Sequence, residues 1–258
     1  MAQPRGPLAG VKVVACSTAQ AGTVPYVLMA DLGAEVIKIE PPGVGDHARG
    51  SGLMPGFPST YFETNNRGVK SLTLNLKTPE GRKILYELVT GADVFGQNFR
   101  PGAAEKNGFG YEQLRQVNPK IVYVSVSGYG PHGPHATLPG TDSMAQALGG
   151  IAEAFSTPGQ PLKTGIVSVA DETCAILAFG GILAGLYCAK TTGVPRPGQS
   201  PGRAAAPALP SYPTRNGCRV SHLGSRPSPG RFGACTKPSR NSSSWRQIFP
   251  CIGSTVSR

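Results

Sequence analysis

Residues 11–39, VKVVACSTAQAGTVPYVLMADLGAEVIKI, decide the fold of this 258-residue chain. They begin with the apolar run Val11–Cys16 and end with the run Glu35–Ile39, and both runs have the length and composition of strands. Between them, Pro25–Leu32 is typical of an apolar helix, and Gly33 can adopt the left-handed conformation on which helices often end. The stretch therefore predicts a βαβ unit with two parallel strands.

The same alternation of short apolar runs and helical patterns continues outward along the chain. Further strands are expected at Leu72–Leu76, Asp93–Phe95, Ile121–Val126 and Ile166–Ala170. Further helices are expected from Pro79, after the capping residue Thr78, and at Tyr111–Val117, Asp142–Leu148 and Asp171–Lys190. This order favours an α/β fold: an open, mostly parallel, doubly wound, Rossmann-like sheet with flanking helices.

The composition changes after Gly193, which divides the chain into residues 1–193 and 194–258. The second part holds ten Lys and Arg and no Asp or Glu, so it carries +10 of the net charge of +11. Pro, Ser and Gly make up 28 of its 65 residues. Such a chain buries too little apolar surface to offset its ordering entropy, so we expect a disordered tail. No nucleic-acid partner is expected, because the first part is nearly neutral and the Arg residues of the tail are isolated.

Neither a secretory signal nor a membrane span is expected. The N-terminal MAQPRGP is not followed by the continuous apolar segment of a signal sequence. The longest uncharged stretch of the first part, Thr173–Ala189, has 17 residues and is rich in Gly and Ala. That length favours a buried core helix over a span of about 20 apolar residues. The six Cys form no C-x-x-C pair, so free thiols and a cytoplasmic location are expected.

Common nucleotide, hydrolase and metal motifs do not fit this chain. GYGPHG at 128–133 matches the letters of the dinucleotide motif G-x-G-x-x-G, but Pro131 and Pro134 predict an extended loop where that motif opens a helix. Neither the phosphate-binding G-x-x-x-x-G-K-[ST] nor the hydrolase G-x-S-x-G occurs. His132 and His135 have no acid or Cys at metal-ligand spacing, so no metal is expected.

Asp171 is the residue whose position suggests chemistry. It lies between the predicted strand Ile166–Ala170 and a predicted apolar helix, at the edge where open α/β sheets bind ligands. In one interpretation it caps the helix, because a carboxylate there accepts backbone N–H bonds. In the other, those N–H groups keep the carboxylate ionised, so that it acts as a nucleophile. Position alone leaves both interpretations open.

Six segments of the chain resemble one known family. They include PLAGVKVVACSTAQAG at 7–22, LMADLGAEVIKIEPPGVGDHARG at 28–50, NNRGVKSLTLNLKTPEGRKIL at 65–85 and TGIVSVADETCAILAFGGILAGLYCAKTTG at 164–193. The other two cover 92–134 and 140–151. In order and spacing, residues 7–193 resemble the N-terminal part of the class III CoA-transferases of the CaiB/BaiF type.

The resemblance implies an enzyme that transfers coenzyme A between an acyl-CoA thioester and a small carboxylic acid, with coenzyme A as a substrate and no metal. The family nucleophile is the Asp before the long Gly/Ala-rich helix, which is Asp171 here. Its carboxylate would form an acyl-aspartyl anhydride and then an aspartyl-CoA thioester, which the acceptor acid attacks. The resemblance also implies Asp142 on the substrate side.

The coenzyme A site implied by the resemblance consists of the turn after the first strand, the strand end LNLK and the loop NFRPG. The matching residues are Gln20, Ala21, Leu74, Asn75, Leu76, Lys77, Asn98, Phe99 and Arg100, with Lys106 where a cation would meet phosphate. Lys and Arg suit the several negative oxygens of a polyphosphate. Lys77 and Lys106 are equally compatible with a solvated surface, and the residues leave that alternative open.

Two substitutions depart from the family pattern. Related acyl-CoA racemases carry a His in the segment that reads GTD here, and Thr141 takes its place, which favours a transferase over a racemase. Pro41 stands where some transferases have a basic contact to CoA, which implies weaker nucleotide binding.

The larger departure from the family is length. Family members continue past residue 193 with a small domain and a return segment, and interlock as homodimers, whereas only Gly198 and Gln199 of this tail resemble that continuation. The tail has the composition of an unrelated exon or of a shifted reading frame, which implies a truncated chain. Three functions stay open at this point: a CoA-transferase, an inactive fragment or CoA-binding subunit, and a racemase.

Overall fold

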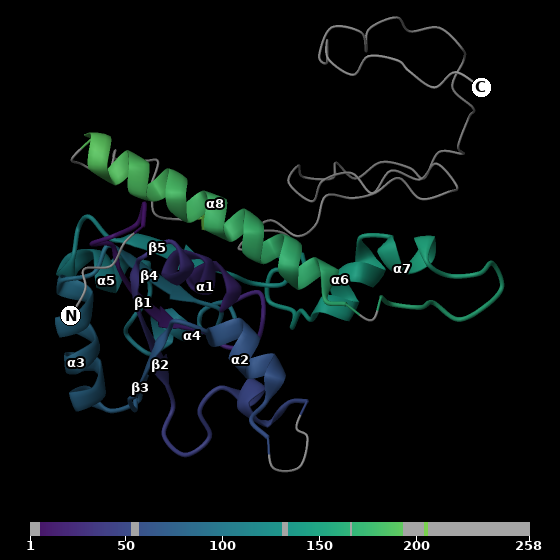
Figure 1. Cartoon of the computed structure of the whole chain (residues 1–258), viewed down its shortest axis with the longest axis horizontal. Coiled ribbons are helices and arrows are strands. Elements are labelled where there is room, and N and C mark those ends of the chain that lie inside the picture. The colour runs from purple at the N-terminus through teal and green to yellow at the C-terminus, as the bar shows by residue number, and fades with distance from the viewer. Residues whose placement is uncertain (1–5, 53–56, 131–133, 166, 193–203, 206–258) are drawn as a thin grey trace, which may run out of the picture. The chain divides into compact units, whose positions relative to one another are not determined.

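The computed structural model describes residues 6–52, 57–130, 134–165, 167–192 and 204–205. They form one parallel sheet in the order β3-β2-β1-β4-β5-β6, and Figure 1 labels the first five of these strands in chain order. The strands are β1 (Lys12–Cys16), β2 (Glu35–Glu40), β3 (Lys70–Thr73), β4 (Val94–Gln97), β5 (Val122–Ser125) and β6 (Ala204–Ala205). The strand order reverses between β1 and β4, where doubly wound sheets bind ligands. The predicted α/β, Rossmann-like sheet is confirmed.

Helices pack on both faces of this sheet (Figure 1). α1 and α8 contribute to the core on one face, and α3, α4 and α5 to the core on the other. The helices are α1 (Val24–Asp31), α2 (Thr60–Asn66), α3 (Pro79–Thr90), α4 (Ala103–Lys106), α5 (Tyr111–Val117), α6 (Asp142–Leu148), α7 (Ile151–Ala154) and α8 (Val169–Thr192), with the 3-10 turn η1 (His47–Gly50).

The central strand β1 contributes to both cores. Val13 and Ala15 point into the core beneath α1 and α8, whereas Val14 and Cys16 point into the core beneath α3 and α5. Successive side chains of a strand face opposite sides of the sheet. A strand that is apolar at nearly every position is therefore stable only where both faces are covered, as its composition predicted.

The third strand is placed differently from its prediction. It was expected at Leu72–Leu76 but is formed by Lys70–Thr73. Its ladder ends with Thr73 opposite Glu40, the last residue of β2, so the parallel pairing stops there. The predicted coenzyme A segment from Leu74 onward consequently lies after the strand, in the turn that leads to α3.

The prediction of a strand immediately before Asp171 is wrong. Within the expected span Ile166–Ala170, residue 166 lies outside the described residues, and Val169 and Ala170 form the first turn of α8. The backbone N–H groups of Ala170 and Asp171 donate to one carboxylate oxygen of Asp142, at 2.9 and 3.0 Å. A helix cap from a distant residue therefore overrides the β-branched composition of this span.

Ala204 and Ala205 are the residues of the predicted tail that the structure describes. They pair in parallel with Val124 and Ser125 of β5, so disorder does not apply to these two. The rest of residues 194–258 lies outside the described residues, and the predicted disorder and the predicted boundary at residue 193 stay predictions.

By length and composition alone, α8 could cross a membrane over Val169–Thr191. One of its faces nevertheless packs on the sheet, where Ala178, Ile182 and Leu186 are buried in the core shared with α1. Most of the span is not buried, so the predicted buried core helix holds for this one face.

Two isoleucines of α8, one buried and one exposed, test this packing. Ile182 is 0% exposed and Ile176 is 59% exposed. We expect Ile182→Ala to lower the free energy of unfolding by about 2–5 kcal/mol, because it leaves a cavity against the sheet. Ile176→Ala should change it by less than about 0.5 kcal/mol. Urea denaturation of both variants makes the comparison, and equal losses would contradict the packing of α8 on the sheet.

Candidate active site

Two loops meet at the carboxyl ends of β1 and β4. The backbone N–H of Thr18 donates to Asn98 Oδ1 at 3.0 Å, and Asn98 Nδ2 donates to the Thr18 carbonyl at 2.8 Å. Gly22 packs so closely on this side chain that a Cβ at its position would lie 2.4 Å from Asn98 Nδ2. The loop of residues 17–23 is thereby held against the loop that begins at Asn98.

The first turn of α8 brings Asp171 to this pair of loops. The backbone of Ala21 donates a hydrogen bond to the half-buried Asp171 carboxylate. Burial, followed by the carboxylates of Asp142 and Glu172, raises the pKa of Asp171 to about 6, while the bond from Ala21 opposes the rise. The result is a carboxylate that ionises near neutral pH, with one directed backbone donor.

Asp142 supplies the helix cap that one interpretation had assigned to Asp171. Its Oδ1 accepts the two N–H groups at the start of α8, and its Oδ2 accepts from Gln146 Nε2 at 2.5 Å. Gln146, which is fully buried, also donates to the Val167 carbonyl at 3.3 Å. The carboxylate of Asp171 is thus left without a capping task, and the predicted contact of Asp142 with substrate stays a prediction.

Gln20 connects the loop of residues 17–23 to α2 and α8. Its Nε2 donates to Glu172 Oε1, and the hydroxyl of Tyr61 donates to its Oε1 at 3.4 Å. Burial and then the negative charge of Asp171 raise the pKa of Tyr61. The hydroxyl of Tyr61 therefore stays protonated at neutral pH, as a hydrogen-bond donor beside the carboxylates.

The remaining predicted coenzyme A residues occupy the same edge of the sheet. Leu74 and Leu76 pack on the core beneath α3, so they support the segment from below. Asn75 Oδ1 accepts the backbone N–H of Lys77 at 3.1 Å and shapes the turn before α3. Phe99 is partly exposed and packs on Phe109 with ring centroids 5.6 Å apart and the ring planes tilted by 59°.

Three predicted phosphate-binding cations are exposed on segments that follow β3 and β4. Lys77 lies in the turn after β3, Arg100 in the loop after β4, and Lys106 on α4. Parallel strands end at one edge, so these cations share the edge that carries Asp171. Their exposure fits both alternatives that the sequence left open, phosphate contacts and solvated charges.

Sequence reasoning missed several residues that the fold brings to this site. Glu172 is adjacent to Asp171 in the chain, and a second acid in one helical turn was a visible signal. Tyr61 gave no local signal, because only tertiary packing brings α2 to Gln20. Lys38 was visible as a charge in the middle of an apolar strand, which is unusual unless the charge is paired.

No group of three or more His, Cys, Asp or Glu side chains capable of holding a metal occurs among the residues that the structure describes. Of the two histidines considered above, residue 132 lies outside those residues. The ring of His135 packs against Tyr129 with centroids 5.7 Å apart.

Residues 8–200 match CoA-transferase family III. The chain belongs to this family. The match confirms the resemblance noted in the sequence and extends seven residues past the predicted boundary at 193. Solved structures agree with it: a CAIB/BAIF family protein from Brucella suis is 36% identical, with a TM-score of 0.69 over 73% of this chain and 51% of that one. A hypothetical protein from Mycobacterium tuberculosis is 33% identical, with a TM-score of 0.70 over 81% of this chain and 56% of that one.

Curated relatives of this family III chain are CoA-transferases. The acetyl-CoA:oxalate CoA-transferase of Acetobacter aceti is 42% identical over 193 residues, which are 74% of this chain and 50% of that protein. The succinyl-CoA:glutarate CoA-transferase of Homo sapiens is 40% identical over 189 residues, which are 72% of this chain and 43% of that protein. The chain therefore spans about half the length of the curated relatives it matches.

The raised pKa of Asp171 has a consequence for stability. A carboxyl group whose pKa is about 6 in the folded chain, against an ordinary value of 3.8, contributes stability that is full below about pH 4 and is lost as pH rises through 6. We therefore expect Asp171→Asn to raise the free energy of unfolding at about pH 8 and to change it little at about pH 4. Thermal unfolding at both pH values measures the effect.

Glu40 provides a control of opposite sign. Burial alone would raise its pKa, but hydrogen bonds from Arg49 and Ser71 hold the pKa at about 2. Glu40→Gln should therefore lower the stability at about pH 8. An Asp171→Asn variant that is destabilised at both pH values would contradict the raised pKa of Asp171.

Proposed function

We propose that this chain transfers coenzyme A between an acyl-CoA thioester and a small carboxylic acid, with Asp171 as the nucleophile. The supporting observation is the half-buried Asp171 carboxylate, which carries a backbone donor at the ligand-binding edge of a CoA-transferase family III fold. Its raised pKa makes it a stronger nucleophile than an ordinary carboxylate, while a pKa of about 6 leaves most of it ionised at neutral pH.

The reaction would proceed through exchange at the Asp171 carboxyl group. A carboxylate oxygen attacks the thioester carbonyl, the C–S bond breaks, and CoA thiolate leaves behind an acyl-aspartyl anhydride. The thiolate then attacks the aspartyl carbonyl, forms an aspartyl-CoA thioester, and releases the donor acid. The acceptor carboxylate repeats both steps in reverse, which yields the new acyl-CoA and regenerates Asp171. One thioester replaces another, so the exchange is nearly balanced in free energy.

The surrounding residues have distinct tasks in this proposal. The Ala21 N–H orients the reacting carboxylate and can donate to oxygen atoms that gain charge during attack. Gln20 donates to Glu172 and accepts from Tyr61, so these two residues hold the carboxylate of Glu172 beside Asp171 in place. Asp142 and Glu172 keep Asp171 basic by charge repulsion. Arg100, with Lys77 and Lys106, would bind the phosphates of coenzyme A.

The class of the donor and acceptor acids is inferred from the proposed reaction and from the names of related enzymes. Oxalate and glutarate appear in the names of related enzymes, so a small carboxylic acid is the proposed acceptor class. A family III homodimer is also proposed, and gel filtration tests it.

A CoA-binding subunit or an inactive fragment is the second candidate, because the chain spans about half of its relatives' length. A racemase is third: the hydroxyl of Thr141 accepts the Met144 N–H and caps α6, so this position offers no base. Solvent deuterium entering the α-carbon of an acyl-CoA would favour the racemase.

Hydroxylamine trapping tests the nucleophile. With acetyl-CoA or succinyl-CoA, we expect a hydroxamate on the peptide that carries Asp171, because hydroxylamine cleaves acyl anhydrides and thioesters. Mass spectrometry should detect it in the wild type and not in Asp171→Ala. Asp31→Asn, which changes an exposed carboxylate on α1, is the control and should keep the label. Equal labelling of Asp171→Ala and the wild type would contradict the nucleophile, and an unlabelled wild type that binds CoA would favour the binding subunit.

Charge reversal tests the coenzyme A site. Arg100→Glu should weaken CoA binding about 10- to 100-fold, because a charged hydrogen bond is lost and a repulsion is added. Lys120→Glu is the matched control, since Lys120 is exposed at the opposite edge of the sheet, before β5. Calorimetric titration with CoA measures both. Equal affinities of the two variants would argue against phosphate binding by Arg100.

A further inference from the structure

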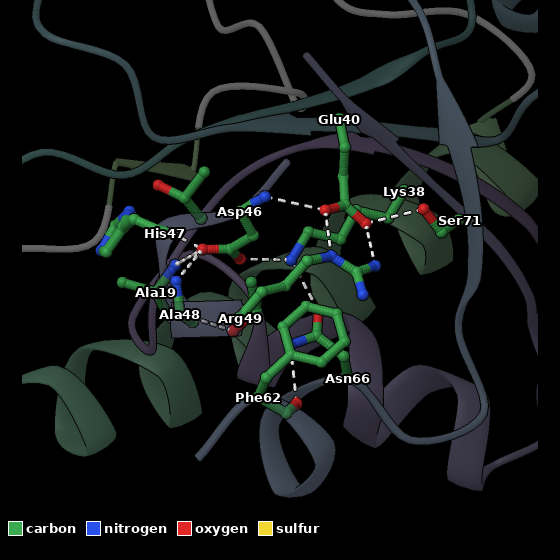
Figure 2. Close-up of polar contacts among 12 residues, drawn as sticks. Ala19, Lys38, Glu40, Asp46, His47, Ala48, Arg49, Phe62, Asn66 and Ser71 are labelled. Carbon is green, nitrogen blue, oxygen red and sulfur yellow. Dashed lines mark hydrogen bonds and ion pairs between the residues drawn. The ribbon is translucent and has the colours of Figure 1, made fainter. Parts of the chain in front are cut away.

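A buried ion pair contacts the loop of residues 17–23 at Ala19 (Figure 2). Lys38 on β2 is 3% exposed and Asp46 is 0% exposed. The Lys38 ammonium donates to Asp46 Oδ2 at 2.5 Å and to Asn66 Oδ1 at 2.6 Å. It also lies 5.3 Å from the ring centroid of Phe62. Charges this deeply buried are retained only when each has a partner.

Every hydrogen-bonding group of Asp46 is engaged. Its Oδ1 accepts the N–H of Ala48 at 2.9 Å, which starts η1, and the N–H of Ala19 at 3.3 Å. Its own N–H donates to Glu40 Oε2 at 2.8 Å. The carboxylate of Asp46 therefore has a fixed orientation, and it uses one of its hydrogen bonds to hold the backbone N–H of Ala19.

A second ion pair fixes Glu40 in turn (Figure 2). Arg49 binds it in a bidentate manner, with Nε and Nη2 at 2.8 and 2.7 Å, and the Ser71 hydroxyl donates at 2.7 Å. The guanidinium lies 3.9 Å from the ring centroid of Phe62. Both cations therefore pack on the ring of Phe62, and Asp46 is held among groups whose charges are paired.

Ala19 is strained where Asp46 contacts it. Its φ is +59°, and among the residues that the structure describes it is the one non-glycine with a positive φ. An L side chain disfavours this conformation, which persists only where the surroundings hold it. Asp46 holds its N–H, and the Thr23 hydroxyl donates to its carbonyl.

The strained residue precedes the donor to the proposed nucleophile by two positions. Ala21 donates from its backbone to the carboxylate of Asp171. Thr18, on the other side of Ala19, is held at both polar groups by Asn98. The φ of Ala19 is therefore one of the backbone torsions that set the position of the Ala21 N–H, because the chain is anchored at Thr18 and at Ala19.

We propose that Lys38 and Asp46 are positioning residues for the reaction at Asp171. The pair holds Ala19 in its strained conformation, and this conformation directs the Ala21 N–H at the Asp171 carboxylate. The role deepens the proposed function and rests on it. Neither Lys38 nor Asp46 contacts substrate in this scheme, since both are buried.

The test replaces the pair with apolar residues. Lys38→Met/Asp46→Leu removes both charges together and leaves no unpaired ion. The bond from Ala21 lowers the pKa of Asp171. Without that bond, the pKa of Asp171 should rise. ¹³C NMR titration of the carboxyl groups in the full chain measures it, with the Asp171 signal assigned by its absence in Asp171→Asn. Hydroxamate formation from succinyl-CoA should slow about 10- to 100-fold.

Rescue by glycine separates positioning from general destabilisation. Gly adopts a positive φ without support, so adding Ala19→Gly to the double variant should return the pKa of Asp171 toward its wild-type value. Glu35→Gln/Lys70→Met, which removes an exposed pair between β2 and β3, is the matched control and should leave that pKa unchanged. An unchanged pKa of Asp171 in the double variant, or a rise that Ala19→Gly does not reverse, would overturn the proposal.

A second variant covers the case in which the double variant does not fold. Thr23→Val removes the hydroxyl that holds the Ala19 carbonyl and keeps the shape of the side chain. It should raise the pKa of Asp171 in the same direction, and Ala19→Gly should reverse the rise; a rise that persists with Ala19→Gly would overturn the proposal. The titration uses no acyl substrate and therefore does not depend on activity. A chain that forms no hydroxamate would contradict the proposed function, but the pKa of Asp171 would still test the positioning role.

Discussion

The parallel pairing of β1 with β4 is the constraint on which the site depends. Val13–Cys16 lie alongside Val94–Gln97, so both strands end at the same edge and their loops meet. The side chain of Asn98 can bind both polar groups of Thr18 only because of this register. A slip by one residue would turn every core side chain of β1 to the opposite face of the sheet. Core packing and site geometry are therefore specified by the same contacts.

The elements that the sequence predicts well are those with local signals. Helix α3 begins at Pro79 as expected, because Thr78 accepts the Gly81 N–H and acts as its cap. The start of α8 could not be predicted, because its cap, Asp142, comes from a separate helix. The neighbours of Asp171 escaped prediction for a similar reason. Tyr61 reaches Gln20 only through packing of α2, which no pattern within α2 encodes.

Two electrostatic regimes lie close together at this edge of the sheet. In one, every buried carboxylate has a cation, as in the pairs Lys38–Asp46 and Arg49–Glu40. In the other, Asp171 lies near two further carboxylates and has a single backbone donor in its favour. The first regime is stable and rigid, while the second is destabilising at neutral pH. Reactive sites commonly show this trade between stability and activity. Here the Lys38–Asp46 ion pair holds the loop of residues 17–23, which lies beside Asp171.

Asp142 joins two properties that proteins usually keep at separate positions. The same carboxylate that starts α8 also adds, after burial, to the raised pKa of Asp171. Every substitution at residue 142 is consequently pleiotropic. Asparagine would keep the acceptor and discard the charge, whereas glutamate would keep the charge and shift the acceptor by one methylene. A change at residue 142 therefore acts on the start of a helix and on the chemistry of a second carboxyl group at once.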